Sequence, residues 1–247
     1  MASRHLPMAT TETVKKPQKR LPSWFRTRLP TGEQQRSFND TKASVKDNKL
    51  HTVCEEARCP NIHECWSSGD ATFMIAGQEC TRACKFCAVG TIRRPPPLDP
   101  EEPKNLADAA ESMNLKHLVV TVVNRDDLPD SGAGHYKSCI EEVSKRLPEL
   151  TLELLCSDLA GSLADLELLL ENSPLDVFAH NVECVQRLDR YVRDPRASFK
   201  QSIEILKHAK IVGDEGLIVA TDYSQKSLEI LSKNQKTKNI KIKCISM

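Results

Sequence analysis

The sequence lacks three features that would point to common classes of partner: many aromatic residues, an excess of one charge, and long apolar runs. Aromatic residues make up 4% of the 247 residues, too few for the stacking surfaces that hold single-stranded nucleic acid. Lysine plus arginine number 35 and aspartate plus glutamate 34, whereas a polyanion binder needs a large basic excess. No apolar run approaches the roughly 18 residues that span a bilayer, and no signal-peptide core follows Met1. We therefore expect a soluble chain with no nucleic-acid partner and no membrane segment.

The near-neutral total hides basic residues that gather at both ends of the chain. Residues 1–20 are basic and poor in acids, as organelle transit peptides are, but they contain few arginines and show no amphipathic period. Charge runs of this kind are usually solvated. We predict a disordered tail over residues 1–20.

Cysteine is abundant and unevenly placed. The chain has 10 cysteines, and six of them fall in one short stretch: Cys54, Cys59, Cys65, Cys80, Cys84 and Cys87. A secreted disulfide scaffold would be short and cysteine-dense throughout, whereas clustered cysteines in an intracellular chain more often bind metal. We interpret the six as ligands and the scattered remainder as buried thiols, which behave as small hydrophobic residues.

The downstream three cysteines have the spacing Cys80-x3-Cys84-x2-Cys87. Three thiolates on one loop can bind three corners of a [4Fe–4S] cluster, which needs four ligands to be closed. The fourth iron then stays open to a small molecule. A structural zinc site is closed by four ligands, usually from two close pairs, and fits this spacing poorly.

The upstream three cysteines, Cys54, Cys59 and Cys65, are separated by four and five residues. They also offer three thiolates, so a second cluster would need one further ligand. Taken alone, they are equally consistent with a zinc site completed by His51 or His63.

The chain after Cys87 alternates between strand and helix patterns. Expected strands lie at 72–76, 116–123, 151–156 and 175–179. Expected helices begin at Pro103, follow the spacing of Tyr136, Ile140, Val143 and Leu147, cover 163–170, and begin again beyond Pro195. Strands that alternate with helices imply a parallel sheet, and this many units predict an α/β fold with a full or partial β/α barrel.

The CxxxCxxC spacing, with Phe86 just before the last cysteine, resembles the signature of the radical S-adenosylmethionine (SAM) enzymes. Paired with the upstream cysteines, it resembles lipoyl synthases, whose pattern is CxxxxCxxxxxC followed by CxxxCxxC. The resemblance covers roughly residues 21–218 and includes stretches at 21–24, 29–32, 51–57, 95–99, 124–130, 178–183 and 192–196.

The resemblance implies a partial β/α barrel of radical SAM type with a cysteine-bearing N-terminal extension. The expected divisions are the tail 1–20, the extension 21–70, the barrel 71–218, and a segment 219–247 that does not match the family. It also implies two [4Fe–4S] clusters. Cys80, Cys84 and Cys87 would hold the SAM-binding cluster, and Cys54, Cys59 and Cys65 an auxiliary cluster that donates sulfur.

By the same resemblance, the activity is radical SAM sulfur insertion into protein-bound octanoyl groups to form the lipoyl cofactor, a sulfurtransferase reaction. The radical chemistry would be supplied by the cofactors. The implied partners are octanoylated lipoyl carrier domains, namely 2-oxoacid dehydrogenase E2 subunits and the glycine cleavage H protein, and an electron donor such as flavodoxin or ferredoxin. Clusters of this kind need reducing conditions, so we predict the cytoplasm, with a mitochondrial or plastid matrix as the alternative.

Three loops should meet at the carboxyl ends of the strands, where such barrels hold their chemistry. We predict that Phe86 belongs to the SAM-binding site and that Asn181 and Glu183 contact the ribose or amino-acid part of SAM. Arg193 and Arg196 suit a carboxylate partner, since a guanidinium binds carboxylates bidentately, with surface ion pairs as the alternative. The carboxylates of the 124–130 loop, Asp126, Asp127 and Asp130, are at least as well explained as caps of turns or helices.

The family pattern is lost after about residue 218. Family members continue with a segment whose serine completes the auxiliary cluster, and Ser246 does not lie in a matching context. The pattern of the tail predicts a strand at 217–221, a helix at 225–232 and a strand at 240–245. Two explanations for the mismatch are a truncated or mispredicted reading frame and a degenerate protein, and a functional variant is the least favoured third. The competing functions are an inactive metal-binding fragment and, less well supported, an iron–sulfur electron carrier, which would close every iron with protein ligands.

Overall fold

The computed structural model describes residues 29, 31–47, 50–56, 59–68, 70–113, 115–212, 217–221 and 242–245. For residues 210–212 and the last two segments, only the course of the backbone is described. The predicted tail at 1–20, the predicted helix at 225–232 and Ser246 therefore lie outside the described residues. Among the described helices, none combines the length and apolar character that crossing a bilayer requires.

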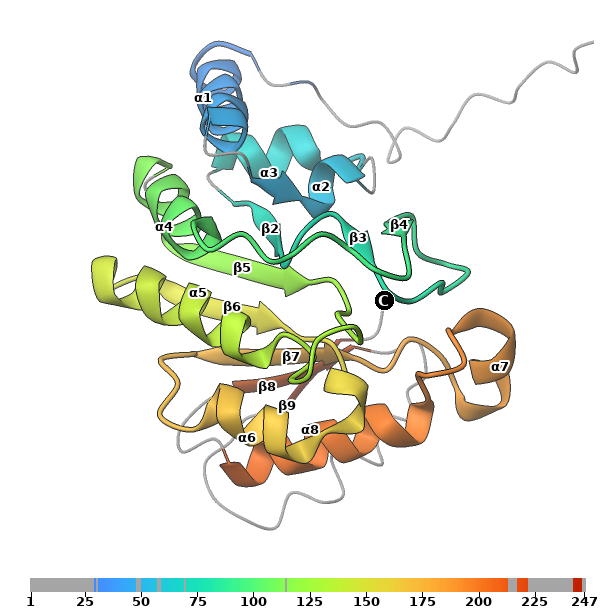
Figure 1. Ribbon diagram of the computed structural model, residues 1–247. Coiled ribbons are helices and arrows are strands. Elements are labelled where there is room, and N and C mark those ends of the chain that lie inside the picture. Colours follow the sequence, from blue (N-terminus) through green and yellow to red (C-terminus); the bar gives the residue numbers. More distant parts are fainter. Residues whose placement is uncertain are drawn as a thin grey trace, which may run out of the picture.

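A seven-stranded sheet lies at the centre of the fold (Figure 1), in the order β1-β2-β5-β6-β7-β8-β9. The strands are β1 (His51–Thr52), β2 (Thr72–Ile75), β5 (His117–Val122), β6 (Thr151–Leu155), β7 (Val177–Asn181), β8 (Leu217–Thr221) and β9 (Ile242–Ile245). All neighbouring pairs are parallel except β1 and β2, which are antiparallel. Parallel strands are covered on both faces and therefore read as continuous apolar runs, as the sequence of β5 does. The predicted α/β class with a parallel sheet is confirmed.

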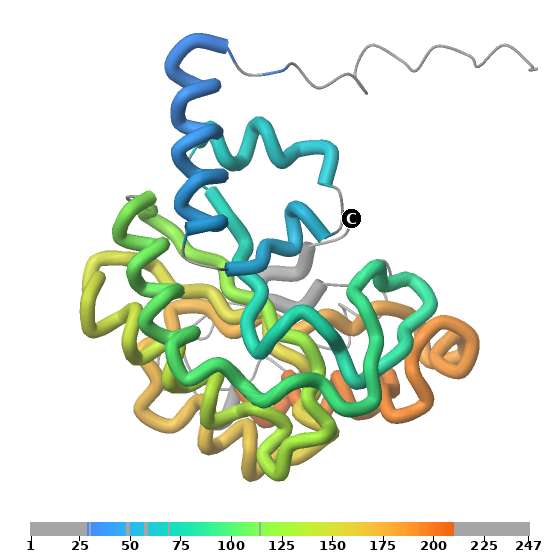
Figure 2. Tube along the Cα trace, turned by 45° about the horizontal axis from the view of Figure 1, so that its top comes forward, coloured from blue at the N-terminus to red at the C-terminus, as the bar shows by residue number. Residues whose placement is uncertain are grey.

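The connecting helices form an outer layer around the strands (Figure 2). They are α4 (Glu102–Ser112), α5 (Ala133–Arg146), α6 (Leu163–Leu170) and α8 (Phe199–Val212). Each buries an apolar stripe at helical spacing, such as Tyr136, Ile140 and Val143 of α5. The start of α6 is fixed by Ser162, whose side chain accepts the backbone N–H of Asp165. These helices lie where the sequence periodicity predicts them.

The end of the chain adds two strands to the same sheet. β8 pairs with β7, and β9 pairs with β8, both in parallel. The two predicted tail strands, at 217–221 and 240–245, are thus confirmed to within two residues. The division expected at residue 218 falls inside β8.

The N-terminal extension lies at the β2 edge of the sheet (Figure 1) and consists of α1 (Glu33–Asp47), β1, α2 (Val53–Glu56) and α3 (Ile62–Ser68). Trp66 of α3 is fully buried, and its ring lies 5.5 Å from that of Phe38 of α1. The Thr41 hydroxyl donates to the carbonyl of Trp66 at 3.2 Å. Phe38 and Trp66 both belong to the main hydrophobic core, so this packing attaches the extension to it.

Short elements frame the segment that carries the downstream cysteines. β3 (Glu79–Cys80) and β4 (Gly90–Thr91) form a two-stranded parallel ribbon. A 3-10 turn (Gln186–Leu188) leads into α7 (Asp189–Val192), and another 3-10 turn (Leu159–Gly161) follows β6. Figures 1 and 2 both show α7 beside the loop between β3 and β4, where the N–H of Lys85 donates to the carbonyl of Val192 at 2.8 Å.

Candidate active site

The three downstream cysteines line one cavity of about 510 Å³. Cys80 ends β3, and the loop after it carries Cys84 and Cys87. The opposite wall consists of the carboxyl ends of β5, β6 and β7 and the loops that follow them. Parallel strands end at the same edge of a sheet, which is why polar groups distant in sequence meet here.

The cavity brings together the site residues that the sequence predicts around this loop. Phe86, Asn181, Glu183 and Arg193 all line it together with the three cysteines. Phe86 is exposed and Arg193 is buried. Arg193 donates to the Val182 carbonyl at 3.2 Å and to the Ser202 hydroxyl at 3.1 Å, so its guanidinium is held in place beside the cavity.

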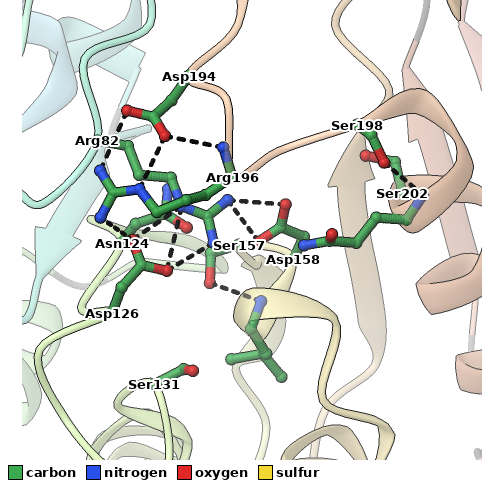
Figure 3. Close-up of polar contacts among 12 residues, drawn as sticks. Arg82, Asn124, Asp126, Ser131, Ser157, Asp158, Asp194, Arg196, Ser198 and Ser202 are labelled. Carbon is green, nitrogen blue, oxygen red and sulfur yellow. Dashed lines mark hydrogen bonds and ion pairs between the residues drawn. The ribbon is translucent and has the colours of Figure 1, made fainter. Parts of the chain in front are cut away.

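A buried arginine anchors the cysteine loop to the sheet (Figure 3). The Arg82 guanidinium donates to Asp126 through Nε and Nη2, at 2.9 and 2.6 Å, and to Asp158 through Nη1 at 2.8 Å. Burial alone would lower the pKa of Arg82, but the hydrogen bonds to the two carboxylates raise it overall. Asp126 also accepts the Thr81 hydroxyl at 2.7 Å. The sequence pattern missed Arg82 and Asp158 because their partners lie far away along the chain.

A second anchor comes from the segment before α8. The Asp194 carboxylate accepts the N–H of Ala83 at 3.0 Å and pairs with Arg196 at 2.8 Å. Arg196 is half exposed and donates to the carbonyl of Thr81 at 2.5 Å. The ion pair that the sequence offers as the alternative for Arg196 is therefore present. Through Ala83 and Thr81, its two members contact the cysteine loop.

The carboxylates of the 124–130 loop divide between two roles. Asp130 caps the start of α5, since it accepts the N–H groups of Gly132 and Gly134 at 3.0 and 2.9 Å. Asp127 binds Arg125 at 2.8 Å and Asp126 binds Arg82. The capping role holds for Asp130, while Asp126 and Asp127 form buried or half-buried ion pairs.

Backbone N–H groups point at two of the three thiols. The N–H of Arg82 donates to Sγ of Cys80, and the N–H of Asp194 to Sγ of Cys84, both at 3.4 Å. Burial raises the pKa of the Cys84 thiol overall, although the Asp194 N–H and the charge of Arg193 partly offset that rise. Such donors stabilise a thiolate, the form in which cysteine binds a metal.

Two nitrogen atoms at the cavity are buried without a hydrogen-bond partner among the described residues, Nε2 of His180 and Nε of Arg193. Nδ1 of His180 contacts the Cys156 carbonyl at 2.9 Å, and a carbonyl can only accept, so Nδ1 carries the proton. Burial lowers the pKa of His180, which leaves Nε2 as an acceptor in a neutral ring. His180 is a site residue that the sequence argument did not single out, although it precedes Asn181.

The upstream cysteines lie close together on the extension. Cys54 is in α2 and Cys65 in α3, and the N–H of Cys59 donates to the Cys54 carbonyl at 2.9 Å. Burial, and then the nearby Cys54 and Cys59, raise the pKa of the Cys65 thiol. Val53 and Glu56 of α2 line the same cavity as the downstream cysteines. The helix that carries Cys54 thus forms part of the cavity wall.

The spacing of both triads differs from that of a site for one ion. A single ion needs three or more ligand atoms, from histidine, cysteine or carboxylate side chains, close to one point. Within the described part of the chain, only Glu102, His135 and Cys139 bring three atoms of these kinds within 4.8 Å of one another. The nine cysteines whose side chains are described, both triads included, are free thiols. His51 instead contacts Gln78 at 2.6 Å, and the His63 ring lies 4.6 Å from that of Phe38. In neither triad do the three Sγ atoms all lie within 4.8 Å of one another, and this suits separate corners of a cluster better than a single zinc ion.

Comparison with known proteins agrees with this geometry. The family model of the radical SAM superfamily matches residues 74–221, and that of the N-terminal domain of lipoyl synthase matches residues 8–59. The chain belongs to the radical SAM superfamily. Membership implies a [4Fe–4S] cluster and SAM, and the residues fit this pair, because three free thiols, two of them with backbone N–H donors, line a cavity that also contains polar side chains such as Asn181 and Arg193.

Within the superfamily, the similar proteins are lipoyl synthases. The chain is 47% identical over 214 residues to the chloroplastic lipoyl synthase of Arabidopsis thaliana, covering 85% of this chain and 53% of that protein. It is 49% identical over 198 residues to the mitochondrial lipoyl synthase of Danio rerio, covering 78% and 49%. The chain spans about half the length of the curated relatives it matches. A solved structure of methylornithine synthase is similar with a TM-score of 0.47 at 14% identity, covering 88% of this chain and 61% of the other.

Proposed function

We propose that this chain is a lipoyl synthase-type radical SAM sulfurtransferase that inserts sulfur into octanoyl groups bound to a carrier protein. The observation that carries the proposal is the joining of both cysteine segments at one cavity: Cys80, Cys84 and Cys87 line it directly, and α2, which bears Cys54, forms part of its wall. A donor of sulfur and a generator of radicals must both reach the same substrate atoms, so their protein ligands must border a common space.

Cys80, Cys84 and Cys87 are proposed to hold the SAM-binding cluster, which when bound supplies one electron to cleave the sulfonium of SAM. The residues around it orient the SAM molecule. Asn181, Glu183 and Arg193 provide polar groups for its ribose and amino-acid parts, and the guanidinium of Arg193 suits a carboxylate. The acceptor Nε2 of His180 adds a partner for a hydroxyl or ammonium donor.

Cys54, Cys59 and Cys65 are proposed to hold a second, auxiliary cluster. No fourth ligand is assigned to this cluster, and Ser246 is not given that role. The apolar part of the cavity wall, including Met74, Val122 and Leu155, can accept an acyl chain, because apolar walls exclude water from a chain without hydrogen-bonding groups.

The proposed partners follow from this substrate. They are octanoylated lipoyl carrier domains, as in 2-oxoacid dehydrogenase E2 subunits and the glycine cleavage H protein, and a reductant such as ferredoxin or flavodoxin. The similar proteins carry the words chloroplastic and mitochondrial in their names, which favours an organelle over the cytoplasm that the sequence argument placed first. We propose an organelle matrix as the site of action.

A second candidate is a metal-binding fragment without turnover. It rests on the same free thiols of Cys80, Cys84 and Cys87 at the cavity. On this reading the downstream thiols bind metal, but no SAM is cleaved.

One experiment separates the two candidates. The chain is reconstituted with iron and sulfide without oxygen, and supplied with dithionite, SAM and an octanoylated lipoyl domain. We expect 5′-deoxyadenosine and thiolated octanoyl product, both abolished by Cys84→Ala and both retained by Cys139→Ala, which removes a buried thiol outside the cavity. Iron uptake with no deoxyadenosine and no product would support the fragment and contradict the proposed activity.

A further inference from the structure

The cysteine loop begins at an unusual backbone turn. Ala76 and Gly77 directly follow β2 and have φ angles of 69° and 99°. Glycine adopts this left-handed region readily, but alanine resists it because its Cβ approaches the following carbonyl. Ala76 is fully buried. The turn directs the chain away from the sheet toward Cys80, so something must hold Ala76 in an unfavourable conformation.

The N–H of Ala76 is held by a carboxylate from the next helix. Oε2 of Glu102, in the first turn of α4, accepts this N–H at 2.8 Å. The same oxygen lies 2.5 Å from Nε2 of His135 of α5. Glu102 and His135 are both nearly buried, so water competes little for this hydrogen bond.

The carbonyl of Ala76 is held by a buried arginine. Nη1 of Arg125 donates to it at 3.1 Å, and Nη2 donates to the carbonyl of Pro96 at 3.0 Å. The other edge of the guanidinium is fixed by both oxygens of Asp127, at 2.8 and 2.9 Å. Arg125 is 2% exposed. One guanidinium therefore joins the residue where the cysteine segment begins to a residue beyond its end.

We propose that Arg125 and Glu102 are positioning residues that set the placement of the Cys80–Cys84–Cys87 loop by holding the two polar groups of the Ala76 peptide. Arg125 joins the two ends of the segment 76–96 by binding the carbonyls of Ala76 and Pro96. Glu102 binds the Ala76 N–H and so keeps Ala76 in the left-handed conformation. This inference rests on the proposed function in one respect, that the loop binds a cluster. Neither residue lines the cavity, so their effect on SAM passes through the backbone.

The group formed by Glu102, His135 and Cys139 has the ligand types of a zinc site. Two of its three side chains already have other roles, because Oε2 of Glu102 binds the Ala76 N–H and contacts Nε2 of His135. Stoichiometric zinc held by these three side chains would assign Glu102 to a metal and overturn its positioning role.

The first test needs no cluster. Hydrogen exchange at the Ala76 amide is followed by mass spectrometry on the metal-free full chain. We expect Arg125→Met and Glu102→Ala each to speed exchange roughly tenfold, the effect of losing a buried hydrogen bond. Arg146→Met is the matched control, since Arg146 also joins α5 to α4, through Asp108 and Glu111, but lies away from Ala76. Unchanged exchange in the two test variants, or equal change in the control, would overturn the proposal.

The second test uses strain relief on the reconstituted chain. We expect Arg125→Met to weaken SAM binding about tenfold and to alter the electron paramagnetic resonance line shape of the reduced cluster. Adding Ala76→Gly to that variant should restore most of both, because glycine needs no clamp to adopt the turn. A merely structural loss would not be rescued by glycine, and absence of rescue in a folded double variant would contradict the proposal. If the unsubstituted chain binds no iron, the proposed function fails, while the exchange test still stands.

Discussion

The backbone N–H of Asp194 donates a hydrogen bond to Sγ of Cys84 at 3.4 Å. The Asp194 carboxylate turns back at the same point to accept the N–H of Ala83 at 3.0 Å. One residue thus holds the cysteine loop through both its backbone and its side chain. Groups that orient a metal ligand are part of the metal site even though they do not touch the metal.

Substitution of Asp194 should therefore loosen the downstream cluster. Asp194→Ala keeps the N–H donor but removes the acceptor for Ala83 and the partner of Arg196. We expect the affinity for cluster iron to fall about 10- to 100-fold, as is typical for the loss of an orienting partner. Iron release to a chelator, followed by absorbance, measures this. Asp165→Ala on α6 is the control, and equal iron release from both variants would contradict the expectation.

The ion pairs around the loop predict acid sensitivity of the metal-free chain. The hydrogen bonds from Arg196 hold the pKa of Asp194 well below its usual range. Burial would raise the pKa of Asp126, but the hydrogen bonds from Arg82 and Thr81 lower it overall. A carboxylate whose folded pKa is depressed stabilises the fold above its unfolded pKa of about 3.9 and loses that contribution as pH falls toward the folded value.

We therefore expect these two carboxylates to contribute a part of the free energy of unfolding that is fully present above about pH 5 and declines as the pH falls from about 5 toward 2. Urea unfolding followed by circular dichroism at each pH measures this decline. Asp194→Asn should flatten the decline, because the substituted side chain no longer titrates. A variant with the same slope as the unsubstituted chain would show that Asp194 does not contribute.

Removal of the Arg82 side chain should be far more costly than removal of a surface charge. Arg82→Met removes the nearest cationic partner of Asp126 and Asp158 and leaves them only the longer contacts with Arg196 at 3.2 Å and Arg193 at 3.9 Å. Removing one member of a buried pair typically costs about 3–5 kcal/mol, because the remaining charge stays buried and unpaired. The urea midpoint of the metal-free chain reports this loss. Lys207→Met, which breaks an exposed pair with Glu204, should change stability by less than about 1 kcal/mol.

The sequence pattern predicts most of the strands and helices, but not the contacts that hold the cysteine loop in place. The helix at 163–170 was predicted with its observed bounds because a local apolar period defines it. The meeting of Asn181, Glu183 and the cysteines was predictable from the rule that parallel strands end at one edge. By contrast, Arg82 and Asp158 are 76 residues apart, and no local pattern encodes such a pair. β1 was missed for a related reason, since a two-residue strand carries no period of its own.

The two triads can be separated by removing one ligand from each. If both hold four-iron clusters, the reconstituted chain should contain about eight iron atoms, and Cys65→Ala or Cys87→Ala should each leave about four. Only Cys87→Ala should remove the change that SAM induces in the electron paramagnetic resonance spectrum, because Cys87 lines the cavity beside Arg193. Cys139→Ala, which removes a buried thiol outside the cavity, serves as the control for general loss of cysteine. If instead Cys65→Ala lowers zinc by one atom and leaves iron unchanged, the upstream triad is a zinc site. The sulfur donor of the proposed reaction would then have to come from outside the chain, because a zinc thiolate site contains no inorganic sulfide.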